Sequence, residues 1–377
     1  MRKILLLVGC LILSRIVSAQ ELEKKGELVY DKVTDKPYTG TYTNYYANGE
    51  TRITSAYKEG KSNGLFVAYS EEGKKLIEQY FVEGVRTGLL KEYYASGVLY
   101  NEVYYKNGLM DGDGVEYYEN GSIKQKMRYV TGKLHGDLVQ YYDSGKERVI
   151  TPYVMGVITG KGKQFYANGL VSVTMTFSDN KKEGACERFD EEGNLYAKVM
   201  YKNNVLEGEQ RQFYANGQVK KVNNYVNDLK NGEELVYYEN GVLKEQNNYK
   251  NDVMDGYSLY NYEDGKRREE GMFKDGKREG ITRLYYESGK LEKETIFKNG
   301  LGNGPSKVFY ENGNVMWEGT YEDDYIKGEL RRYYENGTLQ QEVVFKNDKR
   351  DGYDRLYDTN GKLLEENYYK NDVLVKK

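Results

Sequence analysis

The sequence predicts an all-β protein, built as a single elongated or rolled antiparallel meander of about fourteen tandem β-hairpins. Three observations predict this class: the composition, a strict internal period, and a turn-forming pair of residues in almost every period. The 377 residues include 41 tyrosines and 42 glycines but only 3 prolines. Tyrosine favours strands and glycine favours tight turns. A glycine inside a helix costs about 1 kcal/mol relative to alanine, which disfavours a helical fold.

The period is 24 residues and has no insertions. The phrase "YYENG" stands at residues 117–121, 237–241 and 333–337, and its glycine column runs from Gly49 to Gly361 in steps of 24. A second glycine column begins at Gly40, and a column that is always aromatic begins at Tyr57. The repeats fill residues 40–375, which is fourteen times 24. Such a period indicates a repeat architecture, and columns are named below by their number in the first repeat.

Each repeat is expected to form one hairpin with two turns. Asn48-Gly49 predicts a type I′ turn, in which both central residues have positive φ. Column 60 is always Gly, Asn or Asp, which tolerate the same conformation, so it predicts the second turn.

A first turn centred on Asn48-Gly49 fixes a register that pairs Gly40 with Tyr57 and column 46 with column 51. We expect the aromatic ring to fill the space above the glycine of the neighbouring strand. Substitution of Gly208 by valine is therefore expected to clash with Tyr225.

Column 45 is expected on the opposite face, because side chains alternate along a strand. There it would lie opposite column 52, whose cationic side chains would lay their stems on the tyrosine rings. These cations are Arg52, Lys124, Arg148, Lys220 and Lys244.

The tyrosines of column 45 form the candidate partner-binding face. Tyrosine gives rigid, amphipathic contact area at low entropic cost. The alternative is that the tyrosines form the core of a thin sheet, and both hold if they lie on opposite faces. The candidate residues are Tyr45, Tyr93, Tyr117, Tyr141, Tyr237, Tyr285 and Tyr333.

The first nineteen residues have the layout of a signal peptide. A basic start at Arg2 and Lys3 precedes an apolar run over residues 4–13 and small residues before a cleavage site between Ala19 and Gln20. A lipoprotein anchored at Cys10 is the alternative. We expect a secreted protein or one in a Gram-negative envelope, in the periplasm or on the outer surface. Residues 20–39 would form an N-terminal cap, and residues 376–377 a C-terminal tail.

The net charge disfavours one class of partner, and the cysteine count excludes an intrachain disulfide. Removing three basic residues with the signal peptide leaves 53 basic against 59 acidic residues, a balance of −6, which disfavours a nucleic-acid partner. Cleavage also leaves Cys186 as the one cysteine, so no intrachain disulfide forms.

We expect no catalytic, metal-binding or cofactor-binding residue, and no enzymatic activity. His135 is the only histidine and lies in a variable turn column, and Cys186 is expected to be a buried thiol. The "DGDG" of residues 111–114 lacks the third ligand position of a calcium loop. The "GLGNGPSK" of residues 300–307 lacks the ending of a phosphate loop and falls in the second-turn register.

The repeat motif reads "YYENG-x-L", followed by "Y-K-N-G" and then "x-x-x-G". Over residues 40–375 this motif resembles that of the MORN-repeat variant family, which includes bacterial antitoxin-component-like proteins. The resemblance implies extended antiparallel β arrays and, from the eukaryotic MORN proteins, scaffolding, dimerisation and lipid contact. The usual tryptophan is here Tyr or Phe, so membrane lipid contact is expected to be minor. We expect an exported, non-enzymatic scaffold for a protein, glycan or cell-surface partner. The alternative is an antitoxin-like or immunity-like inhibitor that binds a toxin.

Overall fold

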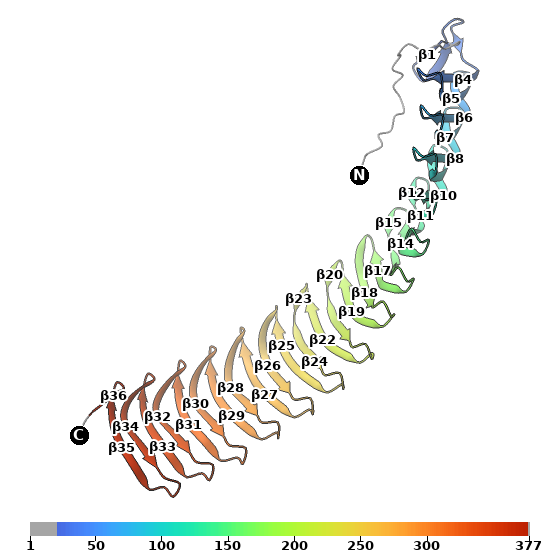
Figure 1. The fold of residues 1–377 in the computed structure, drawn as a ribbon. Coiled ribbons are helices and arrows are strands. Elements are labelled where there is room, and N and C mark those ends of the chain that lie inside the picture. The colour runs from blue at the N-terminus through green and yellow to red at the C-terminus, as the bar shows by residue number, and fades with distance from the viewer. Residues whose placement is uncertain (1–20, 376–377) are drawn as a thin grey trace. The chain divides into compact units, whose positions relative to one another are not determined.

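The protein is all-β in the computed structural model, which describes residues 21–375, and within each part of the chain its repeat strands follow one another in chain order as an antiparallel meander (Figure 1). The predicted fold class is therefore confirmed. Within this range there is no helix of the length and apolarity needed to cross a membrane. The predicted signal peptide, its cleavage site at Ala19 and Gln20, and the alternative anchor at Cys10 lie outside the described residues.

The chain divides into two compact units, Met1–Lys181 and Lys182–Lys377.

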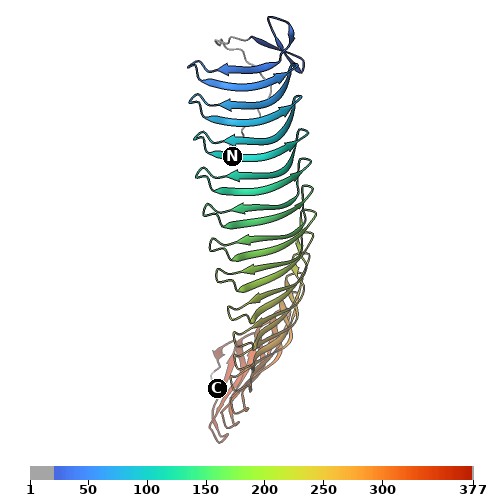
Figure 2. The same ribbon diagram turned by 90° about the vertical axis from the view of Figure 1, so that its right-hand side faces the viewer.

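The first unit contains a three-stranded cap sheet followed by the strands of the early repeats, stacked as a ladder of hairpins in Figure 2. The strands are β1 (Leu22–Lys25), β2 (Leu28–Asp31), β3 (Lys36–Pro37), β4 (Gly40–Tyr45), β5 (Thr51–Lys58), β6 (Lys61–Tyr69), β7 (Lys75–Val82), β8 (Val85–Tyr93), β9 (Leu99–Lys106), β10 (Leu109–Tyr117), β11 (Ile123–Val130), β12 (Lys133–Leu134), β13 (Gly136–Tyr141), β14 (Glu147–Val154), β15 (Val157–Ile158), β16 (Gly160–Phe165) and β17 (Val171–Ser178).

The second unit continues with the same hairpin pattern. Its strands are β18 (Lys181–Phe189), β19 (Leu195–Lys202), β20 (Val205–Leu206), β21 (Gly208–Phe213), β22 (Val219–Val226), β23 (Leu229–Lys230), β24 (Gly232–Tyr237), β25 (Leu243–Lys250), β26 (Val253–Asn261), β27 (Arg267–Lys274), β28 (Lys277–Tyr285), β29 (Leu291–Lys298), β30 (Leu301–Phe309), β31 (Val315–Glu322), β32 (Tyr325–Tyr333), β33 (Leu339–Lys346), β34 (Lys349–Tyr357), β35 (Leu363–Lys370) and β36 (Val373–Leu374).

The cap joins the first repeat at its second turn. The amide of Val29 donates to the carbonyl of Gly60, and the amide of Gly60 donates to the carbonyl of Tyr38, each at 2.8 Å. Tyr38 is buried, and its hydroxyl donates to the carbonyl of Thr41. These bonds tie strands β1–β3 to the start of the repeats.

The second turn has the type I′ conformation that column 60 predicted. Glu59 and Gly60 have φ values of +50° and +78°, and Asn251 and Asp252 have +50° and +66°. Where column 60 is Asn or Asp, its side chain also accepts a backbone N–H from the preceding repeat, as Asp252 does from Lys230 at 2.7 Å. The residue at column 60 thus serves both the turn and the contact between repeats.

The type I′ prediction for the first turn is wrong. Only Gly49 has positive φ there, at +88°. The amide of Gly49 donates to the carbonyl of Tyr46, and the amide of Tyr46 donates to the carbonyl of Glu50. This is a three-residue loop that ends in a left-handed glycine. The asparagine of the first turn acts through its side chain instead: Asn48 accepts the amide of Glu50 and donates to a carbonyl of the next repeat's loop.

The longer loop shifts the register beside it. Tyr45 pairs with Thr51 rather than lying opposite Arg52, because a bulge removes one residue from the pairing. The predicted pairing of Tyr46 with column 51 is therefore wrong. The cations of column 52 were predicted to lie on the tyrosine rings of column 45, but they lie on those of column 46. Arg52 is 5.7 Å from the ring centroid of Tyr46, and Lys244 is 5.7 Å from that of Tyr238.

The predicted pairing of the glycine column is confirmed, but the predicted reason why this column is glycine is not. Gly208 pairs with Tyr225 as expected, yet a Cβ built on Gly208 would meet no atom within 4 Å. The predicted clash with Tyr225 is therefore wrong. The column requires glycine because it sits in a bulge with positive φ, +86° at Gly208. At several repeats a Cβ would also collide with the residue eight positions earlier, as at Gly64, whose Cβ would lie 2.9 Å from that of Ala56.

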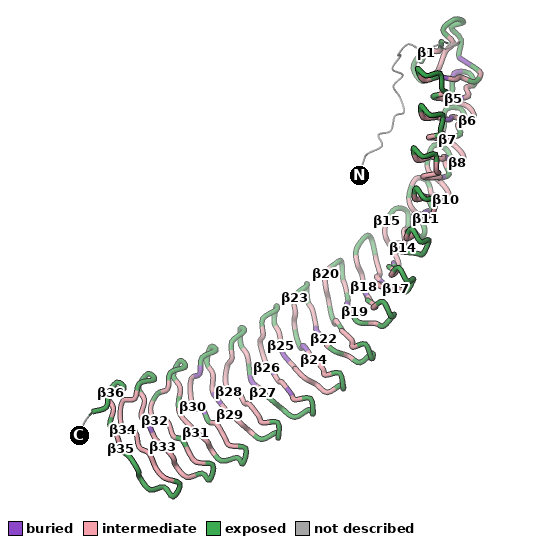
Figure 3. The backbone as a smooth tube through the Cα atoms, viewed as in Figure 1, coloured by how far each residue is buried: buried purple, intermediate pink, exposed green. Residues whose placement is uncertain are grey.

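The core is a narrow line with about one buried residue per strand, while the turns are exposed (Figure 3). Columns 42 and 55 form this line, and they pair across each hairpin, as Cys186 does with Val199. Several pairs are polar and bond to each other, since the hydroxyl of Ser258 donates to Asn247 at 2.7 Å. The buried members are Ser55, Gln79, Leu90, Val103, Gly114, Met127 and Gly162 in the first unit, and Cys186, Val199, Asn223, Glu234, Asn247, Ser258, Gly271, Thr282, Thr295, Ser306 and Val343 in the second.

Column 46 forms a hydrogen-bond ladder that links consecutive repeats. Ten tyrosine hydroxyls of this column donate to a backbone carbonyl 23 residues later, as Tyr238 does to Asn261 at 2.9 Å. The donors are Tyr46, Tyr94, Tyr118 and Tyr142 in the first unit, and Tyr214, Tyr238, Tyr262, Tyr286, Tyr310 and Tyr334 in the second. The second tyrosine of "YYENG" therefore fastens one hairpin to the next.

Tyr238→Phe is expected to lower the free energy of unfolding of the surrounding repeats by about 1 kcal/mol, because it removes one such bond and leaves the ring in place. Hydrogen exchange of residues 255–265 should accelerate about fivefold. Tyr325→Phe is the control, because Tyr325 is 54 % exposed. This variant should leave the hydrogen exchange of residues 255–265 unchanged. Equal exchange in Tyr238→Phe and the unmodified protein would contradict the role given to the ladder.

Candidate interaction surface

One face of the sheet, here called the exposed face, carries columns 41, 43, 45, 54 and 56. Side chains alternate along a strand, so these columns point away from the core line of columns 42 and 55. The strand pairing is consistent with this, since Lys91 of column 43 lies opposite Glu102 of column 54. Column 45 is aromatic in thirteen of fourteen repeats, so within each unit an aromatic row runs along the exposed face.

The structure places all seven candidate tyrosines in these rows. Tyr45 is the most accessible of them, at 38 % exposure, and the other six are half-buried. Tyr141 carries the ammonium of Lys126 5.6 Å from its ring centroid. Tyr237 accepts the ladder bond of Tyr214 at its carbonyl.

The remaining four tyrosines donate their hydroxyls to glutamates of column 54 on the neighbouring hairpin. Donor–acceptor distances are 2.6 to 2.8 Å. The pairs are Tyr93 with Glu78, Tyr117 with Glu102, Tyr285 with Glu270, and Tyr333 with Glu318. These bonds hold the rings in fixed positions, and they are contacts that the sequence analysis did not anticipate.

The bonds change the acidity of the tyrosines. Burial and the hydrogen bond to Glu78 raise the pKa of Tyr93 to about 12, and burial and the bond to Glu102 do the same for Tyr117. Both hydroxyls therefore stay protonated, and remain donors, at all physiological pH values.

Between Glu270 and Glu366, columns 43 and 54 form a ladder of alternating charge along the exposed face. Arg283 lies 2.8 Å from Glu294, and Arg355 lies 2.7 Å from Glu366 and 3.0 Å from Glu342. Lys307 pairs with Glu318 at 2.9 Å, and its hydrogen bond to that carboxylate lowers the pKa of Glu318. The signal for this ladder is in the sequence, because column 54 is glutamate in seven of fourteen repeats.

Exposed apolar side chains flank the aromatic row in columns 41 and 56. Leu65 pairs with Tyr80 on adjacent strands, at 42 % and 51 % exposure. In the second unit, Tyr353 and Tyr368 pack edge to face with ring centroids 5.1 Å apart. Exposed apolar clusters of this kind are typical of interaction surfaces.

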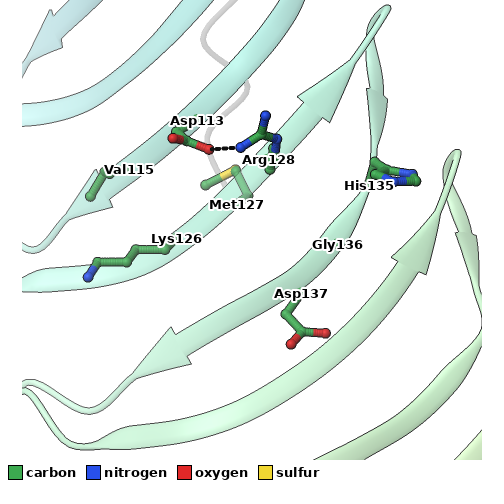
Figure 4. A pocket seen from close by; sticks show the side chains of 9 residues that line it. Asp113, Val115, Lys126, Met127, Arg128, His135, Gly136 and Asp137 are labelled. Carbon is green, nitrogen blue, oxygen red and sulfur yellow. Dashed lines mark hydrogen bonds and ion pairs between the residues drawn. The ribbon is translucent and has the colours of Figure 1, made fainter.

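A shallow cavity of about 450 Å³ lies beside His135 in the first unit. Its lining side chains do not converge, because Asp113 pairs with Arg128 while His135 points away from that pair (Figure 4). The buried Nδ1 of His135 has no hydrogen-bond partner. His135 lies between β12 and β13, immediately before Gly136 of the glycine column. The cavity therefore does not present a catalytic arrangement.

The other motifs examined in the sequence have structural roles. Cys186 is fully buried, and burial raises the pKa of its thiol. Asp111, within the "DGDG" motif, lies in strand β10 and accepts the amide of Thr131. Residues 300–307 form the second turn and strand β30, as predicted. No group of three or more potential metal ligands occurs among residues 21–375.

The sequence model of the MORN repeat variant matches nine segments that together cover more than half of the chain. They are residues 86–107, 110–130, 182–203, 206–227, 230–251, 278–299, 303–323, 327–347 and 350–371. The chain belongs to the MORN repeat variant family. The predicted resemblance is thereby confirmed for the repeats. Each matched segment of this MORN repeat variant protein spans one hairpin around its first turn.

Comparison with curated proteins finds no match for this MORN repeat variant chain. Among solved structures, it is similar to "Crystal Structure of TcdB2-TccC3-Cdc42" at 12 % identity and a TM-score of 0.15, covering 91 % of this chain and 22 % of that chain. It is also similar to "Crystal Structure of TcdB2-TccC3" at 13 % identity and a TM-score of 0.14, covering 91 % and 20 %. The chain thus spans less than a quarter of the length of these structures.

Proposed function

We propose that this MORN repeat variant protein is an exported, non-enzymatic scaffold that holds a protein, glycan or cell-surface partner along its exposed face. The observation that carries the proposal is the difference between the two faces of the sheet. One face supplies the buried line of the core. The other presents aromatic residues at regular intervals, with exposed apolar side chains beside them, and in its columns only Val67, Thr174 and Asn261 are buried among the described residues.

The state of the charged groups supports a binding role over catalysis. The carboxylates of column 54 on the exposed face are bonded to tyrosine hydroxyls or to cations, as Glu318 is to both Tyr333 and Lys307. A general base or a nucleophile needs a carboxylate directed at a substrate. Paired groups of this kind instead fix the shape of a surface.

Fractionation of the native host with N-terminal sequencing tests export. The proposal expects a chain that begins at Gln20 and is recovered outside the inner membrane. A chain that begins at a lipid-modified Cys10 would establish the anchored alternative. Recovery of the uncleaved chain from the cytosol would contradict export.

Affinity capture tests the scaffold. Mature protein immobilised through its C-terminus should retain a defined envelope component, and free mature protein should compete for it. Protection of growth against a co-expressed toxin, without envelope binding, would instead favour the antitoxin-like function.

A further inference from the structure

We propose that the exposed face of the second unit, between β27 and β35, binds a neutral β-1,4-linked glycan chain that runs across the strands. This inference rests on the proposed function and names the class of partner for the same face. Two features of this region carry it: the spacing of its aromatic row and its pattern of donors and acceptors.

The aromatic row is continuous here. Column 45 supplies Tyr285, Phe309, Tyr333 and Tyr357 in four consecutive repeats. Each repeat adds two strands, and neighbouring strands lie about 4.8 Å apart, so successive rings lie about 9.6 Å apart. The two-sugar repeat of an extended β-1,4-linked glycan has nearly this length. One ring per disaccharide would therefore meet the same sugar along the whole row.

The rings are held in place before a ligand arrives. The hydroxyls of Tyr285, Tyr333 and Tyr357 donate to Glu270, Glu318 and Glu342 at 2.6, 2.8 and 2.9 Å. A fixed ring loses little conformational entropy when a sugar packs on it. The apolar C–H face of a pyranose is suited to such a ring, whose face carries partial negative charge.

The charge pattern favours a neutral polymer rich in hydroxyl groups. Carboxylates and cations alternate from strand to strand, with five acidic residues at column 54 and four basic residues at column 43 between Glu270 and Glu366. A hydroxyl donates one hydrogen bond and accepts others, so it complements both kinds of group. An anionic polymer would meet a carboxylate in every repeat, and a cationic one would meet an arginine or a lysine.

Calorimetric titration of the mature protein with cello- and chito-oligosaccharides of two, four, six and eight sugars tests the proposal. Affinity should rise at least about tenfold from the tetrasaccharide to the octasaccharide, because each added disaccharide reaches another ring. It should change less than about twofold between 0.05 and 0.5 M salt, since no net charge is neutralised.

Two variants locate the site. Tyr333→Ala with Tyr357→Ala should weaken octasaccharide binding at least about tenfold. Tyr334→Phe is the matched control: it removes the adjacent ladder hydroxyl, which donates to the carbonyl of Tyr357, and should bind as the unmodified protein does. If the alanine variant does not fold, the dependence on ligand length and on salt decides the matter with the unmodified protein.

Several results would overturn the glycan proposal. They are absence of binding to neutral oligosaccharides, equal affinity for four and eight sugars, binding to anionic polymers alone with loss at high salt, and sedimentation showing that the same face pairs with a second copy. Capture of an envelope protein without glycan binding would overturn this inference and leave the proposed function standing. Capture of no envelope component would reject the proposed function itself.

Discussion

Replacing Gly256 with valine is expected to lower the free energy of unfolding of its repeat by about 2–6 kcal/mol. Two costs combine. Gly256 has a φ of +122°, a conformation that a β-branched residue adopts only with strain of about 1–3 kcal/mol. A Cβ there would also lie 3.0 Å from the Cβ of Asn248, which is fixed to its own backbone and cannot rotate away. Overpacking of this kind costs about 1–3 kcal/mol more.

The matched control is Gly208→Val. Its φ is also positive, at +86°, but a Cβ there meets open space. We therefore expect it to show the strain alone, about 1–3 kcal/mol. Chemical denaturation, with hydrogen exchange to localise the loss, measures both. Equal losses in the two variants would show that the neighbouring Cβ has no effect.

Replacing both Lys221 and Lys230 with methionine is expected to cost about 3 kcal/mol at pH 7, because it strands a buried carboxylate. Glu234 is 5 % exposed, and one of its oxygens lies 2.9 Å from Lys221 and 2.6 Å from Lys230. The variant that also carries Glu234→Leu should recover most of the loss, since an apolar residue of similar size needs no counter-charge. Failure to recover would indicate that the lysines act through packing.

The buried carboxyl of Glu234 also predicts that the free energy of unfolding depends on pH. Burial alone would raise the pKa of Glu234, but its hydrogen bonds with Lys230 and Lys221 hold that pKa below the ordinary value of 4.5. A carboxyl with a lowered pKa stabilises the fold above pH 4.5, and this contribution is lost as the pH falls through the folded-state value. Without the two lysines, burial raises the pKa instead. The double variant should therefore lose less stability than the unmodified protein on acidification below pH 4.5, as thermal denaturation across pH 3–7 would show.

The hairpin period and most of the pairing could be predicted from the sequence, because glycine columns and alternating side chains are local rules. The pairing of Gly40 with Tyr57 follows from them. The first turn could not be predicted in this way. Asn-Gly suits a type I′ turn in isolation, but the three-residue loop forms here even in repeats where column 48 is Glu72 or Ser96, and Asn48 uses its side chain to bond to the loop of the next repeat.

The core line and the polar ladders were harder to predict, because they depend on contacts between repeats. Columns 42 and 55 hold residues as different as Cys186, Glu234 and Thr282, so no column of apolar residues marks them. The hydroxyl bonds of column 45 to column 54 likewise join residues 15 positions apart, as in Tyr285 and Glu270. The structure places the seven tyrosines in one column of the exposed face, and the sequence did not show these hydrogen-bond partners.

Photo-crosslinking from the two faces of one strand tests most directly the claim that the exposed face holds the partner. Arg331 and Arg332 are neighbours on β32 whose side chains point to opposite faces, Arg331 to the exposed face. A photoreactive amino acid placed at each position in turn would be exposed to the native cell envelope and irradiated. We expect a crosslinked partner from position 331 and none from position 332. Crosslinking from position 332 alone, or equally from both, would contradict the account.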